Sequence, residues 1–432
     1  MHRGLTIISF FLLFSLISIQ PMSSAEAAGL QAELSAGLQA ELSAGLQAGL
    51  SAGLQAGHQV ELSVGHQAAP QAPQSGAVLC LPGIDPIATP DCLPLGPSSY
   101  LERMAGLGIT FPLRPVAANS RDPLLGDVPY HYAVLEERQS TPVYASVDDA
   151  IVNNPPLMVI DAGRLRYISY VKYVQIEKGK LFELRNGGWV QVASRVSVPR
   201  SFMGGLVFQR TPERSFGWIV PLNDSVETRR SPGFKNKEFT GHKLLKYDVV
   251  QIYAVKQVED TEWLMVGPDE WIEGTAVGRV IINTTPPKGV TGGRWIEVNL
   301  YEQTLSVYDQ NSLVFATLIA SGLPPFWTRP GVFQVYKRLE STLMSGTFEV
   351  DRSDFYYLED VPWTLYYDEA RALHGAYWRT AFGFPQSHGC VNLSPGDAHW
   401  LYDWARVGDW VYVWDPSGKT PTDPSYYQQG GA

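Results

Sequence analysis

The stretch RWIEVNLYEQTLSVYDQNSLVFATLIASG, residues 294–322, decides the fold of the C-terminal part of the chain. Apolar and polar residues alternate along it, which is the pattern of β-strands that bury one face. Gln310 and Asn311 interrupt the alternation and mark a turn. The stretch therefore predicts an antiparallel hairpin that opens a β domain over residues 294–415.

Further strands and one helix are expected downstream of this hairpin. The helix is predicted over residues 394–409, where Ser394 suits the cap, Pro395 the first position and Asp397 the positive end of the helix dipole. Gly408 is expected to end it. The residues that share its apolar face by their spacing are Ala398, Leu401, Trp404 and Ala405. The strand-like runs are GVFQVYKRL (331–339), WTLYYDEARALHG (363–375) and WVYVW (410–414).

Upstream of residue 294, short runs of Val, Ile and Tyr alternate with Gly, Asn and Pro, which indicates short strands. Two stretches, 182–198 and 264–280, align loosely with Trp189 and Trp271 in the same place. Both resemble bacterial SH3-like wall-associated modules, and each Trp either fills a small barrel or binds a ligand. The modules are predicted over residues 126–222 and 240–290, followed by a linker over 284–293.

The N-terminus has the order of a secretory signal: a basic residue, an apolar run and small residues. The apolar run is short for a bilayer crossing, which needs about 20 residues, and an uncleaved anchor is the alternative. We expect export to the cell wall or periplasm, or secretion, with no membrane span in the mature chain. The segments expected outside the folded domains are a signal peptide (1–27), a low-complexity octapeptide-repeat spacer (28–78), a Pro- and Gly-rich segment (79–125) and a flexible tail (416–432).

The composition allows a large core and argues against nucleic acid as a partner. The chain of 432 residues is 45% hydrophobic and 12% aromatic, and its formal net charge is −10. Phosphate binding requires clustered Lys and Arg, which an acidic chain with 18% charged residues does not suggest.

Export changes the interpretation of the three cysteines, because disulfides persist outside the cytosol. Cys80 and Cys92 flank a proline-rich loop and are predicted to form a local disulfide. Cys390 is then left as an odd thiol. It ends the motif SHGC, with His388 two residues before it, while His374 ends a separate strand-like run.

A thiol attacks an acyl carbon only as thiolate, so a working Cys390 needs a neighbouring base or cation. In an extended stretch His388 and Cys390 point to the same side, and Gly389 lets a substrate approach the backbone, where N–H groups could hold an oxyanion. His374 can be brought alongside from a neighbouring strand, with a backbone carbonyl near Gly375 to orient it. The alternatives are a zinc site of His374, His388 and Cys390, a buried structural cluster, and a disulfide from Cys390 to Cys80 or Cys92.

The motifs LHGAYW (373–378) and SHGCVNL (387–393) resemble the catalytic domain of the L,D-transpeptidase family. That family carries a histidine, a loop, and an S/T-H-G-C signature followed by an apolar residue and Asn or Arg. The likeness covers about residues 294–415. Two features depart from the family pattern: TRPG (328–331) stands where Thr-Pro often precedes a glycine, and the loop between His374 and Ser387 is short.

The resemblance implies a mainly β protein whose L,D-transpeptidase-type β-sandwich catalytic domain has one or two helices. It implies that Cys390 is the nucleophile and His374 the general base, with His388 as the alternative base. Ser387, His388 and Gly389 complete the predicted catalytic site by shaping it. The residues that it suggests for substrate contact are Gly375, Asn392, Trp378, Trp363 and Tyr366.

By the same resemblance, the partners are peptidoglycan stem peptides, and neither a cofactor nor a metal is needed. The thiol would form a thioester with a stem peptide, and an amine from a second stem would resolve it to give a cross-link. Two alternatives stay open: a carboxypeptidase or other cysteine peptidase, in which water resolves the same thioester, and a non-catalytic wall-binding protein.

Overall fold

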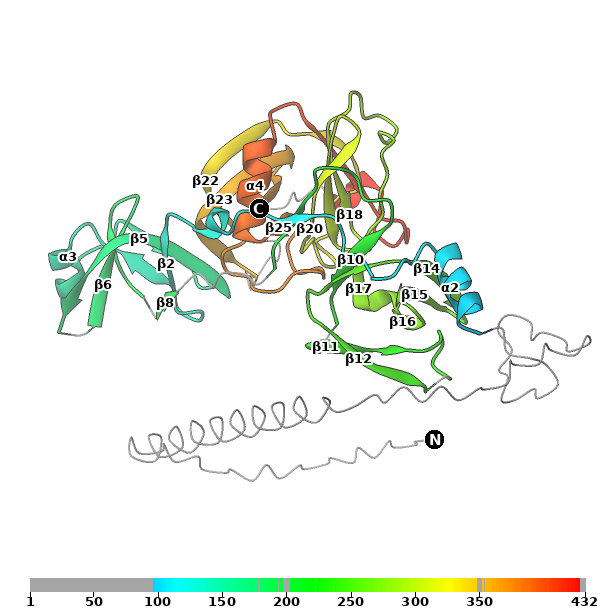
Figure 1. Ribbon diagram of the computed structural model, residues 1–432. Coiled ribbons are helices and arrows are strands. Elements are labelled where there is room, and N and C mark those ends of the chain that lie inside the picture. The colour runs from blue at the N-terminus through cyan, green and yellow to red at the C-terminus, as the bar shows by residue number, and fades with distance from the viewer. Residues whose placement is uncertain are drawn as a thin grey trace, which may run out of the picture. The chain divides into compact units, whose positions relative to one another are not determined.

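The computed structural model describes residues 96–427, except residues 178, 193, 197–202, 222, 236, 348–351 and 353 (Figure 1). The predicted signal peptide, the repeat spacer, and Cys80 and Cys92 lie outside the described residues. Most described elements are strands gathered into sheets, with only short helices between them, so the predicted mainly β class is confirmed.

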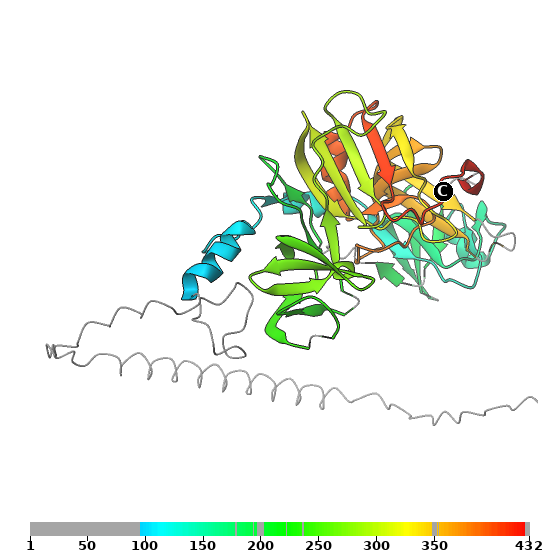
Figure 2. The same cartoon turned by 90° about the vertical axis from the view of Figure 1, so that its right-hand side faces the viewer.

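The hairpin predicted from residues 294–322 is present in a seven-stranded sheet (Figure 2). Gln310 and Asn311 form its turn with φ values of 50° and 60°, the left-handed conformation that tight hairpin turns require. In sheet order, the strands are β1 (Asn119–Ser120), β9 (Leu206–Val207), β20 (Ser312–Leu318), β19 (Thr304–Asp309), β18 (Trp295–Asn299), β26 (Trp410–Trp414) and β21 (Gly331–Gln334).

A nine-stranded sheet holds the remaining strands of the C-terminal part together with strands from upstream. Its C-terminal members are β22 (Lys337–Gly346), β23 (Tyr356–Asp368), β24 (Arg371–Gly375) and β25 (Val391–Leu393). Its upstream members are β2 (His131–Val134), β5 (Leu165–Ile176), β6 (Gly179–Leu184), β7 (Trp189–Gln191) and β8 (Ser194–Val196). β5 runs parallel to β23, with Leu165 in register with Tyr356. Upstream residues therefore continue the sheet of the predicted catalytic domain.

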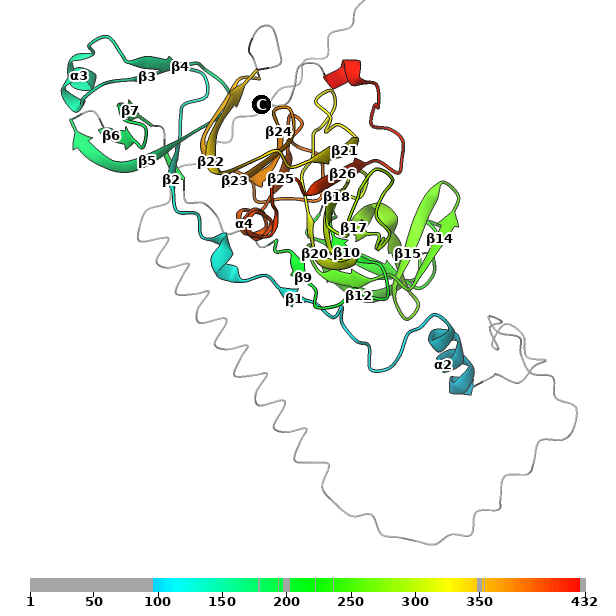
Figure 3. The same cartoon turned by 90° about the horizontal axis from the view of Figure 1, so that it is seen from above.

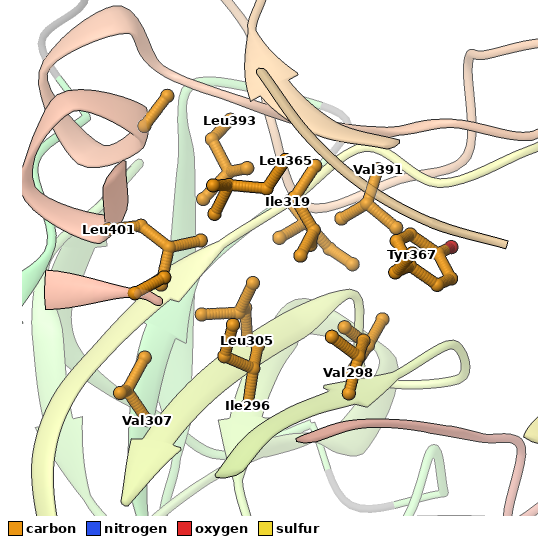
Figure 4. Packing of buried hydrophobic residues seen from close by; sticks show 14 of the residues in the cluster. Ile296, Val298, Leu305, Val307, Ile319, Leu365, Tyr367, Val391, Leu393 and Leu401 are labelled. Atoms are coloured by element: carbon orange, nitrogen blue, oxygen red, sulfur yellow. The ribbon is translucent and has the colours of Figure 1, made fainter. Parts of the chain in front are cut away.

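One apolar core lies between these two sheets, as expected for a β-sandwich (Figure 4). Ile296, Val298, Leu305 and Val307 reach it from the seven-stranded sheet, and Leu365, Leu373, Val391 and Leu393 reach it from the nine-stranded sheet. Leu401 closes the core from the helix α4 (Pro395–Trp404). Burial of these side chains is the main force that holds β24 and β25 in place.

The helix α4 begins as predicted and ends earlier than predicted. The Ser394 hydroxyl accepts the Asp397 N–H at 3.3 Å and caps the helix. The prediction that Gly408 ends the helix is wrong, because Ala405 is already extended. The Arg406 N–H donates to the Asp409 carboxylate at 2.8 Å, so the chain turns away instead of adding a further helical turn.

The second upstream region forms a five-stranded sheet and a three-stranded sheet around their own apolar cluster. Their strands are β10 (Phe216–Ile219), β11 (Ser225–Arg229), β12 (Phe239–Leu245), β13 (Val249–Gln251), β14 (Ala254–Val258), β15 (Thr261–Gly267), β16 (Glu270–Glu273) and β17 (Val277–Val280). β10 pairs with β13 and β17, so strand 216–219, which was predicted in the first module, belongs to the second.

The aligned tryptophans occupy matching positions in two hairpins. Trp189 opens β7 after the turn from β6, and Trp271 lies in β16 after the turn from β15. The SH3-like identity of either region stays a prediction. The remaining short elements are α2 (Gly96–Gly106), η1 (Pro123–Gly126), β3 (Thr141–Val143), α3 (Val147–Val152), β4 (Met158–Ile160), η2 (Gly274–Ala276) and η3 (Pro424–Tyr427).

The segment predicted as a flexible tail is instead attached to the domain as far as residue 427. Tyr427 in η3 is buried, and its backbone carbonyl accepts a hydrogen bond from Arg371 at 3.2 Å. The guanidinium of Arg371 also lies over the Tyr427 ring. Across the described part of the chain, no helix combines the length and apolar character needed to cross a bilayer.

Asp397 connects the start of α4 to three other segments. The labels α4, β1, β9 and β20 mark the helix and the strands of these segments in Figure 3. Its carboxylate is fully buried and accepts from the Arg121 Nε at 2.6 Å, from the Gly205 N–H at 2.8 Å and from the Thr317 hydroxyl at 2.6 Å. A buried carboxylate is stable only when it is paired and hydrogen-bonded in this way. The interaction holds the segment that precedes the first module against the catalytic domain.

Asp397→Asn should therefore destabilise the protein by about 3 kcal/mol, because it leaves the Arg121 guanidinium without its buried partner. Urea unfolding of the full chain measures this loss. Asp403→Asn, at an exposed position of the same helix, is the matched control and should change stability by less than about 0.5 kcal/mol. Equal stability of the two variants would contradict the role of Asp397.

Candidate active site

Parallel pairing of β24 with β25 brings the predicted base and the predicted nucleophile to one side of the sheet. Leu373 is in register with Val391, and His374 with Asn392. Residues in register share a face, and successive residues alternate between faces. Leu373 and Val391 enter the core, so His374 and Asn392 face the opposite side, where Cys390 also lies.

On that side, the side chains line a cavity of about 40 Å³. This volume leaves room for a molecule the size of water, which needs about 10–15 Å³. The lining residues are Leu165, Met344, Tyr356, Leu358, His374, Trp378, Arg379, Ser387, His388, Cys390 and Asn392. Leu165 comes from β5, so the upstream part of the chain supplies one wall of the cavity.

His374 is oriented by a main-chain oxygen, as predicted from the sequence. Its Nδ1 lies 3.3 Å from the carbonyl oxygen of Gly375. In the tautomer in which Nδ1–H donates to this carbonyl, Nε2 is the nitrogen that can accept a proton. The ring is 2% exposed, so little water competes with this contact.

Burial keeps both groups neutral at neutral pH. It lowers the pKa of His374 to about 4, with a smaller contribution in the same direction from the Arg379 guanidinium, against the opposing effect of the Gly375 carbonyl. Burial raises the pKa of Cys390 to about 11, opposed by a backbone hydrogen bond from Ala372 and by the charge of Arg371. These pKa values predict a neutral resting pair, a thiol and an imidazole, rather than a thiolate and an imidazolium.

Ser387 fixes the turn that carries Cys390. Its hydroxyl donates to the Cys390 carbonyl at 2.5 Å and accepts the Gly389 N–H at 3.1 Å. Gly389 has φ +122°, a conformation that side-chain-bearing residues rarely adopt. Because its N–H is engaged by Ser387, the Gly389 amide is occupied in this state and does not point to an oxyanion.

Thr328 is a second clamp on the same turn, and the sequence analysis missed it. Its hydroxyl donates to the Gly389 carbonyl at 2.9 Å and accepts the Gly322 N–H at 2.9 Å. In the sequence, Thr328 was noted only as part of the TRPG stretch, which departs from the family pattern at its proline. Its threonine nevertheless reaches the SHGC turn.

His388 lies at the edge of the cavity, between aromatic rings. Its ring stacks on Tyr356 with centroids 5.6 Å apart and contacts Phe326 at 4.8 Å. Burial lowers its pKa as well. These contacts suit a residue that shapes the site, the role that the sequence analysis gave it.

The structure divides the residues that were predicted to touch substrate. Trp378 and Asn392 line the cavity. Tyr366 packs against the apolar cluster that contains Cys390. Gly375 lies within the sheet, where a Cβ atom would meet the Pro362 Cγ at 3.1 Å. Trp363 does not line the cavity: its ring stacks on His399 of α4, with centroids 4.3 Å apart.

Two further cavity residues, Tyr356 and Arg379, were not singled out from the sequence. Tyr356 lies in β23, and its approach to Cys390 depends on strand pairing. Arg379 lies in the AYWRTAFGFPQ loop between the two histidines, where no residue pattern separates it from a solvated loop arginine.

The structure bears differently on the alternatives to a working thiol, a structural cysteine and a metal site. Cys390 is a free thiol, and it packs among Met344, Tyr356 and Val361, as a structural cysteine also would. Among the described residues, no three His, Cys, Asp or Glu side chains are grouped closely enough to hold a metal ion, and His374, His388 and Cys390 do not form such a group.

The neutral resting pair predicts how Cys390 reacts with an alkylating agent. We expect its alkylation rate to rise steadily with pH toward about 11, since only the thiolate reacts and burial raises the pKa of this thiol. Iodoacetamide labelling followed by peptide mass spectrometry resolves Cys390 from Cys80 and Cys92. A rate that levels off below about pH 8.5, the value for a free thiol, would contradict the neutral pair.

Comparison with known proteins supports the family that the motifs suggest. Residues 293–413 match the family model described as YkuD, the L,D-transpeptidase catalytic domain. L,D-transpeptidase 1 of Mycobacterium tuberculosis is 28% identical over 244 residues, which cover 53% of this chain and 81% of that protein.

Solved structures of the same kind also match. A crystal structure of Enterococcus faecium L,D-transpeptidase is 26% identical, and the match covers 28% of this chain and 50% of that chain, with a TM-score of 0.27. This chain thus spans about half the length of that structure. The separate catalytic domain from E. faecium, solved by NMR, is 28% identical and is covered completely, with 29% of this chain and a TM-score of 0.26. By the family model and the SHGC motif, residues 293–413 belong to the L,D-transpeptidase (YkuD) catalytic domain family.

Proposed function

We propose that the protein is an exported peptidoglycan L,D-transpeptidase with Cys390 as nucleophile and His374 as general base. The observation that carries the proposal is the cavity shared by the Cys390 and His374 side chains, with His374 oriented by the Gly375 carbonyl. The family to which the catalytic domain belongs acts on peptidoglycan, which supports stem peptides as the substrate class.

The neutral resting pair favours attack with general-base assistance. The Cys390 Sγ attacks the acyl carbon after the L-centre of meso-diaminopimelate, or a like residue, in a stem peptide. His374 takes the thiol proton and delivers it to the departing amine of the terminal D-amino acid, which leaves a thioester. An amine from a second stem attacks the thioester, and its proton passes through His374 to the released thiolate.

Because His374 and Cys390 are both neutral in the free enzyme, we expect proton transfer between them to depend on the bound substrate. His374, with a pKa of about 4, is a weak base in the free enzyme, and the thiol of Cys390, with a pKa of about 11, is a weak acid. Charge on either group is therefore costly until the substrate supplies a complementary charge. Attack and proton transfer are then expected to occur together.

The second candidate function is hydrolysis of the same thioester by water, which would make the protein a carboxypeptidase. The cavity of about 40 Å³, lined by Cys390 and His374, has room for one water, which is the acceptor that hydrolysis requires. The products decide between the two reactions.

The decisive experiment incubates the full chain with a disaccharide-tetrapeptide muropeptide and follows the products by mass spectrometry. We expect a cross-linked dimer with loss of the terminal D-amino acid, and no product from Cys390→Ala. A tripeptide monomer as the sole product would assign hydrolysis instead. An unreactive wild-type chain, or a fully active Cys390→Ala variant, would refute the catalytic proposal.

Ser387→Ala tests the turn that presents the nucleophile. Losing two buried hydrogen bonds, each worth about 0.5–1.5 kcal/mol, should displace the Gly389–Cys390 backbone and lower kcat/KM by about 10- to 100-fold. Ser387→Thr keeps the hydroxyl and should stay within about threefold of wild type. If Ser387→Ala turned over the tetrapeptide as fast as Ser387→Thr, the clamp would have no catalytic consequence.

A further inference from the structure

Arg379 carries a positive charge into the wall of the cavity that holds Cys390. It lies in the loop between β24 and β25, next to Trp378. One terminal nitrogen donates to the side-chain oxygen of Gln386 at 2.8 Å, and the other donates to the Gln386 main-chain carbonyl at 2.5 Å. Gln386 in turn donates to the Ala381 carbonyl at 3.0 Å, so the guanidinium is held in one place by the loop.

No described acidic side chain forms an ion pair with this guanidinium. Among the described residues, its hydrogen-bond acceptors are neutral amide oxygens, and its buried Nε has no partner there. Burial lowers the pKa of Arg379 to about 10, which still leaves it charged at neutral pH. A partly buried charge with no acidic partner among the described residues is costly, and tying a loop to Gln386 would not require it.

Two other donors of the same cavity are also without partners. The Tyr356 hydroxyl and the Trp378 Nε1 are buried and accept or donate no hydrogen bond among the described residues. Nine side-chain donors of the described residues are buried without a partner, and three of them belong to residues that line this one cavity, where a ligand that supplies acceptors would satisfy them. Because one of the donors is a guanidinium, the matching acceptor is an anion.

We propose that Arg379 is a specificity-determining residue that binds a carboxylate of the acyl-donor stem peptide. This inference rests on the proposed function, in which the donor has two carboxylates near the scissile bond: that of the departing D-amino acid and that of the D-centre of meso-diaminopimelate. Either one supplies the planar, negatively charged acceptor that a guanidinium binds best. Its arrival would neutralise the buried charge beside the thiol.

The test compares three donors with four forms of the enzyme. The donors are the tetrapeptide with both carboxylates free, the tetrapeptide amidated at its C-terminus, and the tetrapeptide amidated at the D-centre. The enzymes are the wild type, Arg379→Gln, Arg379→Lys and Gln386→Ala. Gln386→Ala is the matched control, since it removes the side-chain contact that holds the loop but leaves the charge.

With the free donor, Arg379→Gln should lower kcat/KM by about 10- to 100-fold, the range for a lost charged hydrogen bond, mainly through KM. Arg379→Lys should recover part of this loss. Amidation of the carboxylate that Arg379 binds should lower wild-type kcat/KM to the level of Arg379→Gln, and the substitution should then change it by less than about threefold. The amidation that lowers wild-type kcat/KM in this way identifies the carboxylate that Arg379 binds. Gln386→Ala should keep the preference for the free donor.

Two results would overturn the inference: an equal loss in Arg379→Gln for all three donors, or no effect of either amidation on the wild type. If the wild type forms no product at all, the proposed function fails. Calorimetric binding of the free tetrapeptide to Cys390→Ala, with and without Arg379→Gln, still tests Arg379 in that case. Equal Kd values, or no binding to either form, would count against it.

Discussion

The site depends on the parallel pairing of β24 with β25. Parallel neighbours cannot be joined by a tight turn and need a long connection. Here the connection is the loop from residue 376 to residue 390, and it carries Trp378, Arg379, Ser387 and His388 into the same cavity. The register of the pair places His374 one position beyond the level of Leu373 and Val391, on the face that Cys390 shares. A shift of one residue would turn His374 into the core.

Exclusion of water has opposite consequences for the groups of this cavity. It raises the pKa of the Cys390 thiol and lowers the pKa of the His374 imidazole, so both stay neutral. Arg379 keeps its charge under the same conditions and lacks an acidic partner among the described residues. Arg379 thus places a positive charge in the wall of the cavity that holds Cys390. In the proposed reaction, the charge of the substrate would offset this positive charge.

The upstream region contributes directly to this site. Leu165 lines the cavity, because β5 extends the sheet parallel to β23. Polar contacts secure this junction: the Ser169 N–H donates to Glu359 at 2.8 Å, and the Tyr132 hydroxyl donates to the Asp360 carbonyl at 2.7 Å. The Tyr132 ring also stacks on Tyr377, with centroids 3.5 Å apart, and Tyr377 in turn contacts the ring of the cavity residue Trp378. The catalytic domain and the first upstream region thus share one sheet.

Local patterns in the chain predict those features that depend only on neighbouring residues. Alternation over 294–322, the Gln310–Asn311 turn and the Ser394 cap each act within a few residues, and all three are present. The SHGC motif is equally local, and it leads to the family. Contacts between distant segments were decided by tertiary packing: Trp363 stacks on His399, the tail packs through Tyr427, and Thr328 reaches Gly389. Leu165 and Arg379 belong to the site for the same reason, since strand pairing and burial, rather than any sequence spacing, bring them to Cys390.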